Sequence, residues 1–404
     1  MFTLYIMKYS NRHILNALND NVYRKDDMKE EYKFSELPML KHMTELLYNS
    51  DMEYNKLISR FKLIRGYQSR LPDYLPNTIQ DAINDMKIVK YVSRFTIQDR
   101  IFDVNLHFDG TKKYMHHDID DYFKKIYMWL YIASRYSSPK CSKYVKINMY
   151  LTPHKKKLPK QYNIIDREHA NTAFTTSCQT ETEIDIFREE EWFKTFIHET
   201  FHNMGMDFSA NGSSYTNELM YAHIPIETDF RMYEAYTECW AEIINSLFVA
   251  FYHMKKQGST NLENVFNVVL NNERRFSVFQ CAKVLSHYNM NLEDLFKQNK
   301  LATLRRNNYK ENTSVLSYYV FKMILMYHAK EFILWSSKYN DRSINFNRKP
   351  DQKKEQQFVN FIKKRMNKAS MMEMLDKANK YLNDNRNKKN MITQSLRMTV
   401  YEAL

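Results

Sequence analysis

Glycine and proline are scarce in this chain, which has 404 residues but only 5 glycines and 8 prolines. Sandwich-like β architectures need many tight turns, and these two residues supply the turn conformations. Their scarcity therefore favours helices joined by short connections. Hydrophobic residues make up 44% and aromatic residues 15% of the chain, which excludes an intrinsically disordered protein. The length allows two or three domains and a large core.

Cysteine is also rare. The four cysteines are Cys141, Cys178, Cys239 and Cys281, and no two of them form a C-x-x-C pair. This number and spacing exclude a disulfide framework and a cysteine-based structural zinc site. Disulfides persist in oxidising compartments, so we expect a reducing compartment and an intracellular protein.

A long uninterrupted apolar run is missing as well. The N-terminal apolar stretch, 1–8, is too short for the hydrophobic region of a secretory signal peptide. The longest apolar run, 315–335, contains Lys322, Lys330 and Glu331. It therefore predicts a buried helix and not a membrane span, and we expect no contact with a membrane.

Basic residues exceed acidic ones, and the formal net charge is +13. Such a surface can attract nucleic acid. The basic clusters are short, however, as at 155–157 and 363–365, and no nucleic-acid module motif is present. We expect solvated surface charge and no nucleic-acid partner. A basic, helical nucleic-acid-binding protein is kept as an alternative function.

The segment His198-Glu199-Thr200-Phe201-His202 is an H-E-x-x-H motif. On a helix, positions i and i+4 lie on the same face, so two imidazoles can bind one metal ion. Glu199 is placed to accept a proton from a metal-bound water. Three acids at 189–191 and apolar residues at helical spacing predict a helix around the motif, and Gly205 predicts its end.

A catalytic zinc usually has three protein ligands, so a third ligand is expected downstream. Phe208 stands where the metzincin pattern has its third histidine, which excludes that pattern. A strongly apolar helix is predicted over 233–250, and buried carboxylates on it would be costly unless a cation meets them. Three glutamates follow one face of this helix at i, i+4 and i+8: Glu234, Glu238 and Glu242. Asp207 and His223, in less regular stretches, are further candidates.

These residues carry a family resemblance. The two histidines with a glutamate on a second helix resemble the gluzincins, and the segment 238–242 is similar to the E-x-x-A-E segment of the anthrax lethal factor catalytic domain and related zincins. The chain also resembles metallopeptidases encoded by large nucleocytoplasmic DNA viruses. The resemblance covers roughly 144–250. It implies a zincin-like core with one Zn²⁺ per chain bound by His198, His202 and Glu238, while Glu242 would orient a ligand histidine.

Strands are expected before the metal-binding helix. Residues 144–151 and 180–187 alternate between apolar and polar side chains, which predicts two strands. Between them, 171–176 is short and β-prone. We predict that this segment, with Asn171, Ala173 and Phe174, is an edge strand to which an extended peptide substrate adds by main-chain hydrogen bonds.

The predicted function is peptide-bond hydrolysis by a zinc-activated water. Glu199 would be the general base, and Tyr233 or Tyr236, or His223, would donate a hydrogen bond to the tetrahedral oxyanion. A peptide or protein is the expected substrate. The main alternative is a catalytically idle zincin-fold protein with a binding or structural role, in a virion if the protein is viral. The expected location is then the host cytoplasm or the virion.

The predicted fold is α+β and predominantly helical. We divide the chain into a mainly helical N-terminal region (1–138), a zincin-like catalytic core (139–258), a helical C-terminal subdomain (259–382) and a polar, partly mobile tail (383–404). Helices in the first region are expected at 34–47, 54–64, 79–92 and 119–134, and a strand at 99–108. Helices in the C-terminal subdomain are expected at 262–270, 277–287, 314–335 and 354–369.

Overall fold

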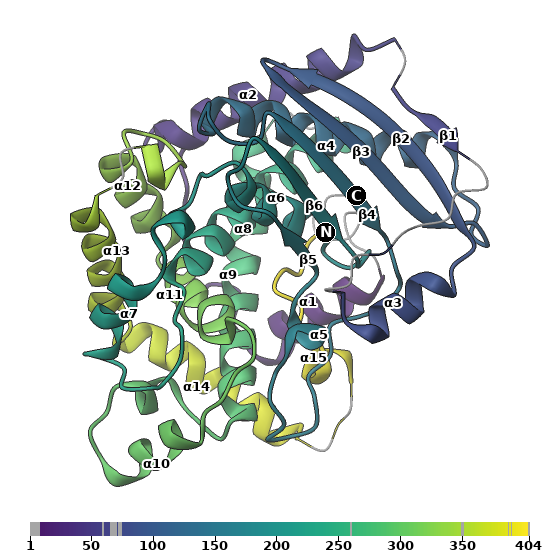
Figure 1. The fold of residues 1–404 in the computed structure, drawn as a ribbon. Coiled ribbons are helices and arrows are strands. Elements are labelled where there is room, and N and C mark those ends of the chain that lie inside the picture. Colours follow the sequence, from purple (N-terminus) through teal and green to yellow (C-terminus); the bar gives the residue numbers. More distant parts are fainter. Residues whose placement is uncertain are drawn as a thin grey trace.

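The fold is that of a computed structural model, which describes residues 9–58, 60–64, 71, 75–258, 261–348, 351–386, 388 and 390–402. A mixed six-stranded sheet lies beside a large group of helices (Figure 1). The strand order is β1-β2-β3-β4-β6-β5. The strands are β1 (Lys62–Ile64), β2 (Ile88–Ile97), β3 (Arg100–Asp109), β4 (Tyr144–Tyr150), β5 (Ala173–Thr175) and β6 (Glu181–Ile186).

Strands β3, β4 and β6 run parallel, whereas β1, β2 and β5 each pair antiparallel with their neighbours. Side-chain alternation directs the buried apolar side chains of β3 to one face of the sheet. On β3, Phe102, Val104 and Leu106 are fully buried, while Ile101 and Asp103 point to the opposite face. Helix α4 (His116–Tyr136) covers the buried face (Figure 1), where its aromatic side chains pack on those of β2 and β3.

Two long helices form the centre of the helical part. Helix α8 (Met232–Gln257) packs against α6 (Trp192–Asn203) on one side and against α9 (Leu262–His287) on the other (Figure 1). The other α-helices are α1 (Tyr9–Asn21), α2 (Pro38–Asn55), α3 (Asn77–Asn84), α5 (Arg167–Ala170), α7 (Ser214–Tyr221), α10 (Lys300–Asn308), α11 (Lys322–Tyr327), α12 (Ala329–Tyr339), α13 (Gln352–Arg365), α14 (Ala369–Asp384) and α15 (Met391–Gln394). A π-helix over Leu316–Phe321 precedes α11.

The predicted mixture of helices and strands with helix in excess is confirmed, and so are the three strands expected around 144–187. The helix predicted at 54–64 is wrong, because α2 ends at Asn55 and β1 follows. The helix predicted at 79–92 is half wrong, because α3 ends at Asn84 and β2 begins at Ile88. In both cases a short apolar run fits either periodicity, and pairing with a neighbouring strand decides the outcome. The two helices expected at 262–270 and 277–287 are one continuous helix, α9.

The predicted domain boundary near residue 138 falls between two strands of the same sheet. Strand β3 lies before it and β4 after it, and the two pair in parallel over seven residues each. Part of the N-terminal region is thus continuous with the sheet that carries the expected substrate strand. Among the described residues, no helix is long and apolar enough to cross a membrane.

The C-terminal segment corrects a further expectation. Residues 395–402, assigned above to a polar, mobile tail, lie in the core. Leu396, Met398, Val400 and Tyr401 are almost fully buried. Two buried carboxylates bind the amides of this segment: Glu191 accepts hydrogen bonds from Met398 N and Thr399 N, and Glu273 accepts from Val400 N and Tyr401 N. These acceptors are distant in sequence, so local composition did not reveal them.

Glu191 therefore links the start of α6 to the C-terminal segment, and its carboxylate also lies 2.8 Å from Lys156 Nζ. We expect Glu191→Ala to destabilise the fold by about 3–5 kcal/mol, because it leaves a buried lysine and two amides without their acceptor. Urea unfolding measures the difference. Glu53→Ala, which removes an exposed ion pair with Lys56, should change stability by less than about 1 kcal/mol.

The difference in unfolding free energy between the wild-type protein and Glu191→Ala should depend on pH, which gives a second readout. Burial raises the pKa of Glu191, but Lys156, Lys194 and Arg397 outweigh it and lower the pKa from 4.5 to about 2. A carboxyl group whose pKa is lower in the folded protein than in the unfolded chain stabilises the fold at a pH above the unfolded-state pKa. This stabilisation is lost as the pH falls towards the folded-state pKa. The wild-type protein and Glu191→Ala should thus differ most above pH 4.5 and converge towards pH 2. A difference that stays constant over this range would contradict the assignment.

Two of the four cysteines form a disulfide, Cys141–Cys178, whereas Cys239 and Cys281 are free and buried. The bond joins the segment before β4 to the segment before β6 and lies against Gly205. A Cβ atom at Gly205 would stand 2.8 Å from Cys141 Sγ, and its φ of +64° also favours glycine. The scattered cysteines thus do pair, and the argument for a reducing compartment from their spacing no longer holds.

Candidate metal centre

Helix α6 carries the H-E-x-x-H motif in the interior of the protein. All twelve of its residues are buried, and it packs against β5, β6 and α8. His198 and His202 lie one turn apart on the same face, and their Nε2 atoms are 3.0 Å apart. The helix ends as predicted, just before Gly205.

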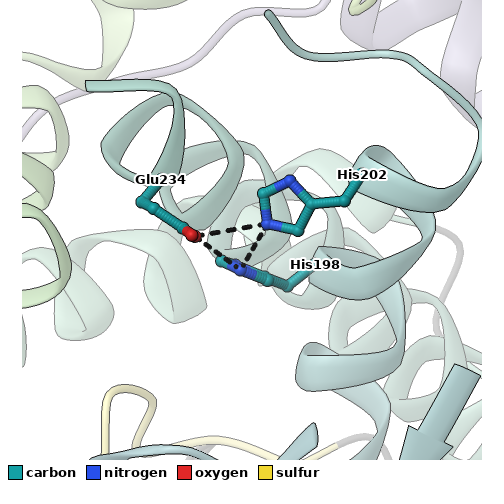
Figure 2. Close-up of side chains that lie close together, drawn as sticks. All are labelled: His198, His202 and Glu234. Carbon is teal, nitrogen blue, oxygen red and sulfur yellow. Dashed lines mark hydrogen bonds and ion pairs between the residues drawn. The ribbon is translucent and has the colours of Figure 1, made fainter. Parts of the chain in front are cut away.

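Glu234, in the first turn of α8, completes the group (Figure 2). Its Oε2 atom lies 3.1 Å from His198 Nε2 and 3.2 Å from His202 Nε2. The three side chains point toward one another, and their ligand atoms lie within 4.8 Å of one another. Two imidazole nitrogens and one carboxylate are the donor set of many catalytic zinc sites, so these residues fit a zinc ion.

The structure does not place Glu238 in this group, contrary to the prediction. Glu238 Oε2 lies 2.8 Å from His198 Nδ1, on the side of the ring away from Glu234, and Glu238 Oε1 accepts a hydrogen bond from Lys194 Nζ at 2.5 Å. Glu238 is thus placed to orient a ligand histidine, the role predicted for Glu242.

Glu242 is one further turn from the centre. It is fully buried and lies 3.5 Å from Lys322 Nζ. The position expected of Glu238 is thus occupied by Glu234, and that expected of Glu242 by Glu238, one helical turn nearer the N-terminus of α8. The i, i+4, i+8 spacing puts all three glutamates on one face, and only the position of α8 along α6 selects Glu234.

Asp207 supports the second histidine. Its Oδ2 atom contacts His202 Nδ1, and its Oδ1 atom accepts hydrogen bonds from Ser209 N and Ser209 Oγ at 3.1 and 2.7 Å. Asp207, a candidate ligand in the sequence, thus lies on the far side of the imidazole from Nε2. Both histidines have a carboxylate at Nδ1, which leaves Nε2 of each available to bind a metal ion.

Burial and charge set the protonation of the site. Burial lowers the pKa of His202, but the carboxylates of Asp207 and Glu234 outweigh it and raise this pKa well above its usual value. Burial raises the pKa of Glu234, but His202 and His198 outweigh it and lower it. Burial is also the main cause of the raised pKa of Glu199. A carboxyl group with a raised pKa suits proton transfer near neutral pH.

A cavity of about 570 Å³ opens onto the centre. His198, Glu199, His202 and Glu234 line it, and so does the predicted edge strand. Asn171, Ala173 and Phe174, the three predicted residues of that segment, all line the cavity. Strand β5 is at the end of the strand order, so it is an edge of the sheet, as expected.

The tyrosines predicted near the oxyanion differ in their placement. Tyr233 lines the cavity, and its ring lies 6.0 Å from that of His202. Tyr236 does not line the cavity: it is fully buried, its hydroxyl donates to Ile344 O at 2.7 Å, and Asn340 Nδ2 donates to it at 2.9 Å. His223 is likewise absent from the lining and stacks on Phe296.

Tyr318 was missed by the sequence analysis. It projects from the π-helix over Leu316–Phe321, lines the cavity with Glu199, and its ring lies 6.0 Å from that of His198. The apolar run at 315–335 predicted only a buried helix. Nothing local distinguishes Tyr318 from its neighbour Tyr319, whose hydroxyl donates to Leu396 O in the core.

No family model matches the chain, and no solved structure matches it. The chain is similar to Uncharacterized protein R210 of Acanthamoeba polyphaga mimivirus, with 31% identity over 147 residues. The match covers 34% of this chain and 36% of the mimivirus protein, so the chain spans little more than a third of that relative.

Proposed function

We propose that the protein is a zinc-dependent peptidase of gluzincin type. The observation that carries this proposal is the convergence of His198 Nε2, His202 Nε2 and Glu234 Oε2 beside Glu199 in one cavity. A zinc ion bound by these three residues would supply a water of lowered pKa and a Lewis acid for the substrate carbonyl. The alternative is a catalytically idle zincin-fold protein, and the experiments below distinguish it from an active peptidase.

Glu199 is the general base in this proposal. It precedes His202 by three residues on α6 and lines the cavity beside the ligands, so its carboxylate faces the position of an attacking water. It takes the proton of that water and returns it to the leaving amine. Its raised pKa favours the first transfer, because the carboxylate of a weaker acid gains a proton more readily.

Strand β5 supplies the binding surface for the substrate. It pairs with β6 on one side only and borders the cavity, so an extended peptide can add to its other edge by main-chain hydrogen bonds. This mode of binding would bring a peptide carbonyl into the cavity that Glu199 and the proposed zinc ligands line. The mimivirus relative supports a viral source, and with it a location in the host cytoplasm or the virion.

Tyr318 and Tyr233 are the two phenols that can donate a hydrogen bond to the oxyanion from the described cavity wall. We expect Tyr318→Phe to lower kcat by about 10²–10³-fold with little change in KM, because the bond forms only in the transition state. Steady-state kinetics on a cleaved peptide measure this. Tyr319→Phe is the matched control, and a large loss in Tyr233→Phe alone would assign the role to Tyr233.

The zinc content of the purified protein tests the proposed centre. We expect one zinc per chain in the wild-type protein and none in His198→Ala/His202→Ala, by elemental analysis after dialysis. The zinc-loaded protein should then cleave members of a peptide library. Absence of zinc after its addition would overturn the metal centre, and bound zinc with no cleavage of any peptide would favour the idle protein.

A further inference from the structure

A second hollow of about 540 Å³ lies on the sheet, on the face opposite to α4. Lys90, Val92 and Arg94 alternate along β2 and line it. On β3 and β4, Asp103 pairs with Arg94 and Lys146 in the sheet register. The hollow therefore follows the outward side chains of neighbouring strands, and none of the proposed zinc ligands lines it.

The lining of this hollow is strongly basic. Four strand side chains that line it are cationic and one is acidic; the cations are Lys62, Lys90, Arg94 and Lys146, and the acid is Asp103. Arg60 also borders the hollow, but its guanidinium pairs with Asp120 of α4. Asp103 is bound by Arg94 through two hydrogen bonds of 2.5 and 2.6 Å. Glu183 pairs with Lys146 at the border of the hollow. Positive charge exceeds negative charge even when these acids are included.

Burial and the excess of positive charge both lower the pKa of basic groups at the hollow. Burial lowers the pKa of Lys90, and the charge of Lys146 lowers it further. His107, which pairs with Lys90 in the sheet register, has a pKa lowered to about 3 by burial and by the charges of Lys90 and Lys146. Burial is the larger cause of both shifts, and the positive charges of the hollow add to it; the same charges attract an anion.

We propose that this hollow binds single-stranded nucleic acid through its phosphates. The cations come from the region of four adjacent strands, a span of about 14 Å, which exceeds the reach of one phosphate and suits a chain of them. The aromatic ring of Tyr144 also lines the hollow, and such a ring offers a stacking surface for a base. This ring favours a nucleic acid over an acidic peptide. The inference does not depend on the proposed peptidase activity.

Binding of a fluorescently labelled 12-nucleotide single strand, measured by anisotropy between 50 and 200 mM salt, tests the proposal. Lys62→Gln/Lys146→Gln removes two exposed charges from the hollow. We expect at least a tenfold loss of affinity at 100 mM salt and a salt slope smaller by about 1.4, since each phosphate contact on a single strand contributes about 0.7. Lys256→Gln/Lys300→Gln is the matched control, with the same charge change at exposed positions of α8 and α10.

Equal losses in the two double variants would overturn the proposal, because the binding would then follow net charge alone. Stronger binding of poly-glutamate than of the oligonucleotide would also overturn it, in favour of an acidic protein partner. Preference for a duplex of the same length would exclude the single-stranded ligand. Circular dichroism and thermal unfolding of each variant show whether the fold is retained, and Tyr144→Phe, which keeps the ring, should bind as the wild type does.

Discussion

Replacing Glu199 with glutamine is expected to reduce peptide hydrolysis by about 10²–10⁴-fold or more while zinc stays bound. The amide has nearly the shape of the carboxyl group, so the buried surroundings on α6 are retained. It cannot accept a proton from water, so the attacking nucleophile is no longer generated. The proposed zinc ligands His198, His202 and Glu234 are unchanged, which separates loss of chemistry from loss of metal.

Hydrolysis of a library-selected peptide and the zinc content are measured on the same preparation. Glu218→Gln makes the same chemical change at an exposed position of α7 and should retain both full activity and zinc. Hydrolysis by Glu199→Gln at the wild-type rate would overturn the proposed mechanism. Loss of zinc in this variant would show instead that Glu199 helps to bind the metal.

Glu234→Ala is expected to lose zinc on dialysis, whereas Glu238→Gln is expected to retain it with about 10–100-fold lower affinity. The first variant leaves two protein ligands where a catalytic site uses three. The second keeps a hydrogen-bond acceptor beside His198 Nδ1 and Lys194 Nζ but removes the charge that makes the imidazole a better ligand. Added zinc should therefore restore activity to Glu238→Gln and not to Glu234→Ala.

Competition with a chelator of known affinity measures both dissociation constants. Glu242→Gln is the control on the same helix face, since Glu242 lies near Lys322 and away from the histidines. The reverse order, with zinc lost in Glu238→Gln and kept in Glu234→Ala, would restore the assignment implied by the resemblance to lethal factor. Far-ultraviolet circular dichroism of the metal-free proteins excludes unfolding as the cause of a lost site.

Part of the site could be predicted from the sequence because it depends on local periodicity. A helix repeats every 3.6 residues, so His198 and His202 must share a face wherever the helix lies. The two-residue period of strands likewise revealed β4 and β6, and the short segment between them is the edge strand β5. The same reasoning identified three glutamates on one face of α8 as candidates for the third ligand, but it could not choose among them.

The rest was decided by contacts between segments far apart in the chain. The position of α8 along α6 selected Glu234 over Glu238, and packing of the π-helix brought Tyr318 to the cavity. The sheet gathered Lys62 and Lys146 into one hollow, although the sequence shows them as isolated charges. Burial of 395–402 depended on Glu191 and Glu273 in the same way. Periodicity determines which side chains share a face of one element, but only tertiary packing determines what that face meets.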